Sequence, residues 1–257
     1  MSDSSLPPWA HWLKRCLPAV ALVAASLLLL RFDVRILRWG NRGFPDDPHG
    51  WTEQFLLGLR DFGQILPVIV TCVVVAAFDR RWRRVVAAIL LSQLVAMVVY
   101  NGGKYTIVRY RPNSGVVDFD DPATRPADTW VGWAPGNTDD RSSSFPSGHS
   151  AAAFAFGTVL ATFYPRLAWL FWTLAFGCAA SRFIQFFHWP SDCLVGGTIG
   201  YLSACLVLGI FGPGHKRPLG KRTEPVPGTA QGLSSDPAEQ VVMTSAGGPR
   251  NDRLCCR

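Results

Sequence analysis

Six apolar runs, separated by polar or charged segments, constrain the fold of this chain more than any other feature of its sequence. The last run clearly reaches the length of about 18 to 20 residues that a membrane-spanning helix needs, and most of the others approach it with a few tolerable residues at one end. We therefore predict an all-α polytopic membrane protein with a bundle of six transmembrane helices; a soluble helical bundle is the alternative. The runs are Cys16–Leu30, Ile65–Phe78, Val85–Tyr100, Ala151–Tyr164, Leu167–Ala180 and Cys193–Phe211.

Tryptophans near the run ends support a membrane location, because Trp concentrates at membrane–water interfaces. They are Trp12, Trp82, Trp169 and Trp189. The composition excludes a chain that is disordered throughout, since 49% of the residues are hydrophobic. The net charge of +7 would suit a nucleic-acid binder, but the Lys and Arg residues punctuate the apolar runs instead of covering one face. We predict no nucleic-acid partner.

The sequence divides into two parts. Residues 1–212 carry all six apolar runs and form the predicted membrane domain. From Pro213 onward the chain is rich in Gly, Pro and Ser with scattered charges, so residues 213–257 are predicted to be a disordered cytoplasmic tail. The vicinal pair Cys255 and Cys256 in this tail has no metal-type spacing, and its role stays unassigned.

An arginine-rich turn sets the predicted orientation. Four arginines fill the very short segment between the second and third runs: Arg80, Arg81, Arg83 and Arg84. Such a cluster marks a cytoplasmic loop. With six spans both termini are then cytoplasmic, in an inner membrane, and three loops face outward. These loops are residues 31–64, 101–150 and 181–192.

Two features of the outward segments are predicted from local sequence. The first run is followed by Arg31, Phe32 and Asp33, without a small-residue cleavage site, so we expect an uncleaved anchor instead of a signal peptide. A short amphipathic helix is expected around Trp51–Leu59. Residues 113–145, rich in Pro, Asp, Gly and Ser, are expected to be an exposed loop that either shapes a headgroup pocket or is a plain linker.

The first of three polar clusters runs from Lys104 to Pro112. Lys104 and Arg111 are seven residues apart, so on a helix that continues from the third run they would lie on one face. Pro112 disfavours helix at Arg111 and marks the boundary. Two such cations at a membrane surface make a phosphate clamp, because Arg binds phosphate bidentately. A basic flank attracted to lipid headgroups is the alternative.

The second cluster, residues 145–150, leads directly into the fourth apolar run. Its sequence predicts a turn that feeds a helix N-terminus, where free N–H groups and the helix dipole favour an anion. Gly148 permits close approach of the backbone, Ser147 adds a donor, and His149 can transfer a proton near neutral pH. The alternative is that Ser147 only caps the helix while His149 points to solvent.

The third cluster, residues 181–192, ends at the start of the last run and contains the cation Arg182. His188 and Asp192 are four apart, and this spacing can bring the carboxylate to a ring nitrogen of His188 and fix its tautomer. The other ring nitrogen is then a directed nucleophile. A structural His–Asp capping pair is the alternative, although ionisable groups this close to membrane spans are costly and therefore favour a function.

Together the three clusters place cations, a helix N-terminus, two histidines and a carboxylate on one predicted membrane face. This set suits phosphoryl transfer: cations bind the phosphate oxygens, one histidine attacks phosphorus and the other protonates the leaving oxygen. The clusters have neither the Asp-rich ligation typical of Mg²⁺ nor the His/Cys spacing of zinc, so we expect no metal and no other cofactor.

Over residues 10 to 212 the chain resembles the type 2 phosphatidic acid phosphatase superfamily, whose three signatures KxxxxxxRP, PSGH and SRxxxxxHxxxD all match. The resemblance implies a six-span, metal-independent membrane phosphatase. It further implies that His188 is the nucleophile that becomes phosphorylated, that His149 protonates the leaving group and that Asp192 supports the nucleophile. The resemblance also implies a phosphate-binding set of Lys104, Arg111, Ser147, Gly148 and Arg182.

The expected substrate is a lipid phosphate or pyrophosphate whose headgroup reaches the outer interface. Phosphatidic acid, phosphatidylglycerol phosphate, polyprenyl pyrophosphate and lipid A phosphates all meet this description. Two other functions are open: a vanadate-dependent haloperoxidase, which uses a related pocket in soluble enzymes, and a non-catalytic lipid-phosphate-binding membrane protein or transporter. The sequence makes no prediction of the oligomeric state.

Overall fold

The computed structural model describes residues 20–43 and 50–212, and each of the six apolar runs is helical over its described part. Cys16 at the start of the first run, the predicted tail and the vicinal cysteines lie outside the described residues. The helices are Val20–Leu30, α2 (Asp33–Gly43), α3 (Trp51–Asp61), α4 (Ile65–Phe78), α5 (Trp82–Thr106), α6 (Gly148–Phe163), α7 (Ala168–Ile184) and α8 (Pro190–Phe211). Short 3₁₀ turns are η2 (Pro112–Ser114), η3 (Pro126–Thr129), η4 (Asp140–Ser142) and η5 (Pro165–Leu167).

The helices differ in their capacity to cross a membrane. Within the described residues, three are long and apolar enough: α5, Pro165–Ile184 and α8. The pair Thr52–Asp61 and Ile65–Phe78 qualifies only together and is bent by 55°. Val20–Leu30 and α6 are shorter, and the 16 residues of α6 span about 24 Å against a hydrocarbon core of about 30 Å. The predicted count of six spans therefore stays a prediction.

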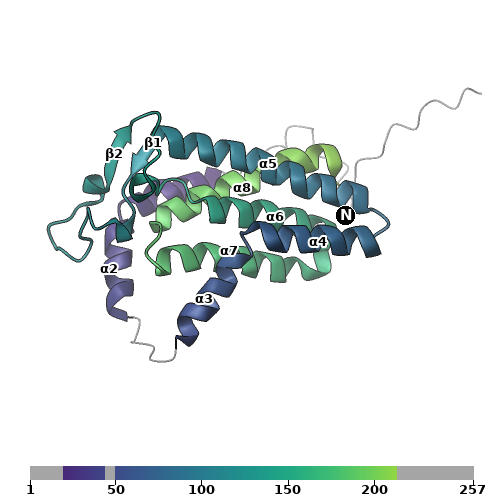
Figure 1. The fold of residues 1–257 in the computed structure, drawn as a ribbon, viewed down its shortest axis with the longest axis horizontal. Helices are drawn as coiled ribbons and strands as arrows, with labels where there is room; N and C mark the ends of the chain where they lie inside the picture. The colour runs from purple at the N-terminus through teal and green to yellow at the C-terminus, as the bar shows by residue number, and fades with distance from the viewer. Residues whose placement is uncertain (1–19, 44–49, 213–257) are drawn as a thin grey trace, which may run out of the picture. The chain divides into compact units, whose positions relative to one another are not determined.

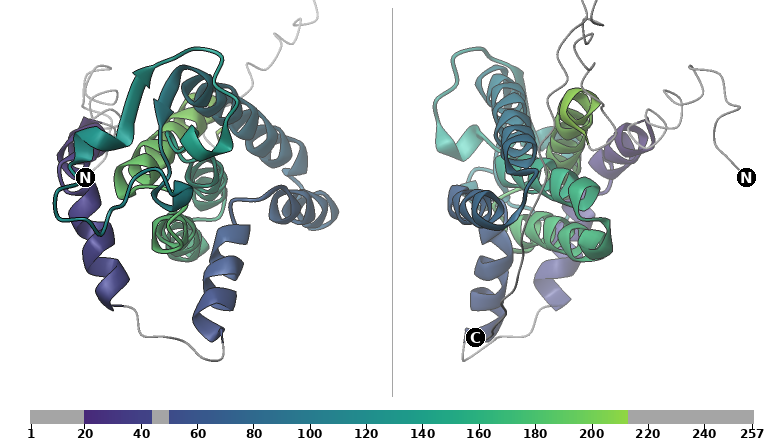
Figure 2. Two further views of the ribbon diagram at one scale, coloured as in Figure 1. Left: turned by 60° about the vertical axis from the view of Figure 1, so that its left-hand side comes forward. Right: turned by 90° about the vertical axis from the view of Figure 1, so that its right-hand side faces the viewer.

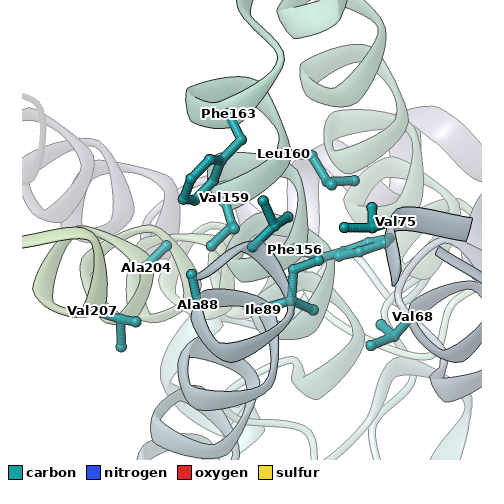
Figure 3. Packing of buried hydrophobic residues seen from close by; sticks show 11 residues of the cluster. Val68, Val75, Ala88, Ile89, Phe156, Val159, Leu160, Phe163, Ala204 and Val207 are labelled. Atoms are coloured by element: carbon teal, nitrogen blue, oxygen red, sulfur yellow. The ribbon is translucent and has the colours of Figure 1, made fainter. Parts of the chain in front are cut away.

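Helix α6 lies at the centre of the helices and packs against α5, α7 and α8 (Figure 1). Almost every residue of α6 is buried, and its aromatic and aliphatic side chains form the main apolar cluster with residues of α4, α5 and α8 (Figure 3). In a membrane this contact is stabilised by close packing, because lipid tails are as apolar as the side chains they would replace. The labelled members include Phe156, Val159, Leu160 and Phe163 of α6, Val68 and Val75 of α4, Ala88 and Ile89 of α5, and Ala204 and Val207 of α8.

Two glycines bring α8 directly against the backbone of α6. Gly196 and Gly200 are four residues apart on one face of α8. A Cβ at Gly196 would collide with the carbonyl oxygen of Ser147, and one at Gly200 with that of Ala151. Small residues at this spacing allow such close helix contacts. As a result the first turns of the two helices lie side by side, and the Ser147 N–H donates to the Asp192 carbonyl over 3.1 Å.

The two long segments before α4 and after α5 are more structured than the sequence predicts. The amphipathic helix expected around Trp51–Leu59 is confirmed as α3, and α2 is an additional helix in the same segment (Figure 2). Helix α5 ends at Thr106, and the chain continues as β1 (Ile107–Arg109). This strand pairs antiparallel with β2 (Trp130–Trp133), so the expected 113–145 loop contains a strand and the fold is not purely α-helical.

One interface tryptophan was predicted wrongly. Trp169 and Trp82 are exposed, as membrane anchors are, but Trp189 is completely buried. It packs with Val34 and Leu37 of α2 and donates from Nε1 to the Tyr110 carbonyl over 2.7 Å. Trp189 therefore fixes α2 and the chain at Tyr110 to the first turn of α8.

The glycine contact generates a stability prediction with a control on the same helix. Gly200→Ala should destabilise the detergent-solubilised protein by about 1–3 kcal/mol, because the added methyl forces α8 away from α6. Gly209→Ala should not, since a Cβ at Gly209 meets nothing within 4 Å; it should stabilise the helix by roughly 0.5–1 kcal/mol. Thermal unfolding of both variants checks this, and equal midpoints would contradict the proposed contact.

Candidate active site

A single cavity of about 780 Å³ collects most of the sequence-predicted site residues. It lies where the last turn of α5, the first turn of α6 and the segments flanking the α7–α8 connection meet. The predicted residues on its wall are Lys104, Arg111, Gly148, His149, Arg182 and His188. Two predicted residues, Ser147 and Asp192, do not line it and are fully buried behind the wall.

The three cavity cations, Lys104, Arg111 and Arg182, come from different elements. Lys104 ends α5 and donates from Nζ to the Ser143 carbonyl over 2.7 Å. The prediction that Lys104 and Arg111 share a helix face is wrong, because α5 ends before Arg111. Arg111 instead reaches the cavity wall from the end of the β1–β2 ribbon, two residues after β1. Its N–H donates to the Arg141 carbonyl over 2.8 Å.

Two of the arginines on the cavity wall, Arg111 and Arg182, carry unused donors. Arg111 Nε and Arg182 Nε are buried and have no hydrogen-bond partner among the described residues. Arg182 also lies over the Phe187 ring at 4.4 Å and donates from Nη1 to Gln185 over 3.3 Å. Because buried donors without acceptors are costly, these groups indicate an anionic ligand that accepts hydrogen bonds.

The first turn of α6 forms another part of the wall through Gly148 and His149. Ser147 caps this helix, and its Oγ accepts from the Ser150 hydroxyl over 3.1 Å. Of the two roles considered for Ser147 from the sequence, the structure shows helix capping by its side chain. The free N–H groups and dipole of α6 still favour an anion at this end of the cavity.

His188 is held in one tautomer by a backbone carbonyl. Its Nδ1 lies 2.7 Å from the Ser144 oxygen, which can only accept, so Nδ1 carries the proton and Nε2 is left with a lone pair. Burial first, and then the three cavity cations, hold the pKa of His188 well below its ordinary value of 6.5. The imidazole is therefore neutral at pH 7 and can act as a nucleophile.

The direct contact that the sequence suggested between Asp192 and His188 is not formed. The Asp192 carboxylate accepts instead from the Ser144 hydroxyl over 2.6 Å, from the Trp189 N–H over 3.2 Å and from Arg109 Nη1 over 2.5 Å. The four-residue spacing places Asp192 in the first turn of α8, where it serves the helix N-terminus. The role predicted for Asp192 in catalysis stays a prediction.

Sequence reasoning missed Arg109 and Asp33, which are both fully buried and form an ion pair of 2.7 Å. Their positions beside predicted membrane spans could have drawn attention to them, because an ionisable side chain there carries a high free-energy cost unless it is paired. It also missed Arg60 and Gln64, at the α3–α4 junction, which line the cavity. The 113–145 segment contributes to the wall as well, through Asn137, Thr138, Asp140 and Ser143.

Comparison with known families decides where the chain belongs. The sequence model of the PAP2 superfamily matches residues 81–214, and all three polar clusters lie in that range. The chain belongs to the PAP2 superfamily. The resemblance drawn from the three signatures is thereby confirmed, while Asp33 and Arg60 lie before the matched range.

Two curated relatives share only part of their length with this PAP2 protein. A lipid A 1-phosphatase from Porphyromonas gingivalis is 27% identical over 206 residues, which cover 76% of this chain and 38% of the relative. The bacitracin transport permease protein BcrC from Bacillus licheniformis is 38% identical over 64 residues, or 25% of this chain and 32% of the relative. The chain thus aligns with about a third of the length of these relatives.

Two solved structures share the fold at 20% identity. LpxE from Aquifex aeolicus has a TM-score of 0.53, and the match covers 69% of this chain and 95% of that one. A transmembrane PAP2-type phosphatidylglycerolphosphate phosphatase from Bacillus subtilis has a TM-score of 0.50, with 74% and 94% covered. These likenesses support the helical PAP2 fold of this integral membrane protein.

Proposed function

We propose that this PAP2 protein is a membrane phosphatase that hydrolyses a lipid phosphate or pyrophosphate through a phosphohistidine intermediate, without a metal. The observation that carries the proposal is one cavity that holds Lys104, Arg111 and Arg182 beside two histidines. Two of these cations, Arg111 and Arg182, have a buried Nε without a hydrogen-bond partner among the described residues. The likeness to a lipid A 1-phosphatase and to a phosphatidylglycerolphosphate phosphatase supports the same reaction class.

In the first proposed step, the Nε2 lone pair of His188 attacks phosphorus. The bond between phosphorus and the leaving oxygen breaks, and that oxygen takes a proton from His149. Burial, and then the neighbouring cations, lower the pKa of His149 to about 4, so the negative charge of the bound phosphate has to offset these cations for His149 to enter this step protonated. The three cavity cations and the α6 N-terminus stabilise the charge on the transferring phosphoryl oxygens.

In the second proposed step, water attacks the phosphorus of phosphohistidine. His149 accepts the proton of the water, and the N–P bond breaks with its electron pair returning to Nε2. Inorganic phosphate leaves, and both histidines regain their starting protonation states. No step needs a metal, because the cations that balance the phosphoryl charge belong to the chain itself.

The position of the cavity along α5 supports the proposed orientation. Lys104 is in the last turn of this 25-residue helix, whereas Arg83 and Arg84 are in its first turn. A helix of this length spans about 37 Å, so the arginine-rich turn and the cavity lie at opposite ends. With the arginines cytoplasmic, the active site faces the periplasm and both termini face the cytoplasm.

Loss of the nucleophile tests the reaction. His188→Ala should reduce phosphate release by at least about 10⁴-fold, because the proposed first step depends on the Nε2 lone pair of this residue. Phosphate release from phosphatidic acid, phosphatidylglycerol phosphate, polyprenyl pyrophosphate and lipid A should be measured with and without EDTA. A ³²P-labelled substrate should give an acid-labile phosphoprotein in the parent protein alone, with activity unchanged by EDTA.

The control for this experiment is Arg125→Ala, which removes an exposed cation paired only with Asp128 and should leave turnover unchanged. A labelled His188→Ala protein would contradict the nucleophile assignment. Strict dependence on Mg²⁺ would contradict the metal-free reaction. Peroxidase activity with added vanadate, or tight lipid binding without turnover, would favour the two other functions.

The environment of His188 predicts the acidic limb of the pH profile. Because burial and the cavity cations lower the pKa of His188, the neutral nucleophile persists as the pH falls through 6.5 and is lost only at lower pH. In kcat/KM profiles, the inflection assigned to His188 should therefore lie below pH 6.5. An inflection at or above 6.5 for a substrate whose phosphate charge is constant would contradict the buried, cation-lined site.

A further inference from the structure

We propose that Arg109 and Asp33 are positioning residues that hold Asp192, and through Ser144 the imidazole of His188, in the geometry of attack. This inference rests on the proposed phosphatase function. It assigns a task to two residues that the three family signatures do not specify. Arg109 stands at an unspecified position of the first signature, and Asp33 precedes the segment that matches the family.

Arg109 bridges two buried carboxylates. Its Nη2 donates to Asp33 over 2.7 Å and its Nη1 to Asp192 over 2.5 Å, and all three side chains are completely shielded from solvent. Its Nε donates to the Thr129 hydroxyl over 3.1 Å. The rings of two tryptophans enclose the guanidinium, at 4.4 Å for Trp130 and 5.1 Å for Trp189. A planar guanidinium with several donors suits this double bridge, which a lysine does not reproduce.

The network continues without a break to the nucleophile. The second oxygen of Asp192 accepts from the Ser144 hydroxyl over 2.6 Å, and the Ser144 carbonyl accepts from His188 Nδ1 over 2.7 Å. Ser144 is therefore held at its side chain by Asp192 while its backbone orients the imidazole. A shift of Asp192 moves the carbonyl that fixes the tautomer of His188.

The opposite end of the network is anchored on α2. Asp33 accepts from the Ser191 N–H over 2.9 Å and also from the Ser191 hydroxyl. It thus connects α2 to the first turn of α8. Such a buried ion network contributes little net stability compared with apolar packing of the same volume. Precise placement of Asp192 is the benefit that this arrangement offers.

The network lies outside the substrate cavity, and this separates its effect from that of the phosphate clamp. Neither Arg109 nor Asp33 lines the cavity, whereas the three cavity cations do. Loss of the network should therefore lower kcat and leave KM and competitive inhibition by inorganic phosphate nearly unchanged. A substitution that only loosened the fold would instead lower kcat and ligand affinity together.

The test uses Asp33→Asn, which removes a charge and keeps the shape of the side chain. We expect kcat to fall about 10- to 100-fold, as for other residues that orient an active group, with KM changed less than about twofold. Asp33→Asn combined with Asp192→Asn should be no worse than Asp192→Asn alone, because both act through one path. Arg109→Lys should retain only part of the activity. The matched control is Asp128→Asn, which removes a carboxylate from an exposed ion pair.

Unchanged kcat in Asp33→Asn would overturn the inference, as would a parallel loss of kcat and of inorganic phosphate affinity, or strictly additive effects in the double variant. These outcomes all require an active parent protein. If the parent releases no phosphate from any lipid, it is the proposed function that fails.

A separate observation concerns the wall that α3 and α4 add to the cavity. We infer that Arg60 forms a second anion subsite, for a lipid headgroup that carries a second phosphate. The cavity of about 780 Å³ is in the size range of whole small-molecule ligands, which exceeds the needs of one phosphate. Lys104, Arg111 and Arg182 serve the transferred phosphate, which leaves Arg60 as an additional cation on the wall.

Local contacts present Arg60 to the cavity. Its carbonyl accepts from the Cys178 thiol over 3.4 Å, which ties this turn to α7. Asp61 binds the Nε and Nη2 of Arg60 over 3.2 and 3.0 Å and also accepts from Gln64 over 2.6 Å. The Nη1 group makes no hydrogen bond to the described residues, and 31% of the side chain is exposed. A second phosphate can therefore bind Nη1 without displacing Asp61.

Matched substrate pairs test this subsite, which also rests on the proposed function. Arg60→Ala should raise KM about tenfold for polyprenyl pyrophosphate or phosphatidylglycerol phosphate, because a charge-assisted hydrogen bond is lost. KM for polyprenyl monophosphate or phosphatidic acid should change less than about twofold. Arg125→Ala should affect neither. Equal changes within both pairs, or no change in either, would overturn the subsite, whereas an inactive parent would overturn the phosphatase.

Discussion

The contact between the backbones of α6 and α8 is the constraint on which the site depends. Because Gly196 and Gly200 lack side chains, the two helices approach until their first turns lie side by side. One of these turns presents His149 and the other holds Asp192, two residues after Pro190. A wider separation would move His149 on α6 away from His188, which lies in the connection just before α8, so the two histidines would no longer share a cavity.

The helical fold and the chemical groups could be predicted from the sequence, since both depend on local patterns. Apolar runs identify helices, and a PSGH segment before such a run identifies a helix N-terminus beside Ser147. The spacing of Lys104 and Arg111 identified two residues that do line one cavity. The sequence predicted this from a shared helix face, whereas in the structure α5 ends at Thr106 and a two-stranded ribbon follows. Residue identity was thus more informative than the assumed secondary structure.

The connections between distant segments could not be predicted. The i,i+4 spacing of His188 and Asp192 suggested a direct pair, but the carboxylate faces Arg109 and a serine carbonyl takes its place at the imidazole. That outcome depends on Asp33, which is more than 150 positions away in the chain and has no periodic or motif signal. Long-range pairing of buried charges follows from topology, which one sequence does not display.

The burial of Asp33 has a consequence for how this architecture can diversify. The segment that matches the PAP2 superfamily is residues 81–214, whereas α2 and α3 precede it. One of these helices anchors the catalytic geometry through Asp33, and the other contributes Arg60 to the mouth of the cavity. Changes in α3 can therefore alter which headgroup is admitted, while a segment transplanted without α2 would leave Arg109 with half of its counter-charge. In this amino-terminal region, α3 therefore affects the choice of headgroup, and α2 affects the placement of the catalytic groups that the later helices supply.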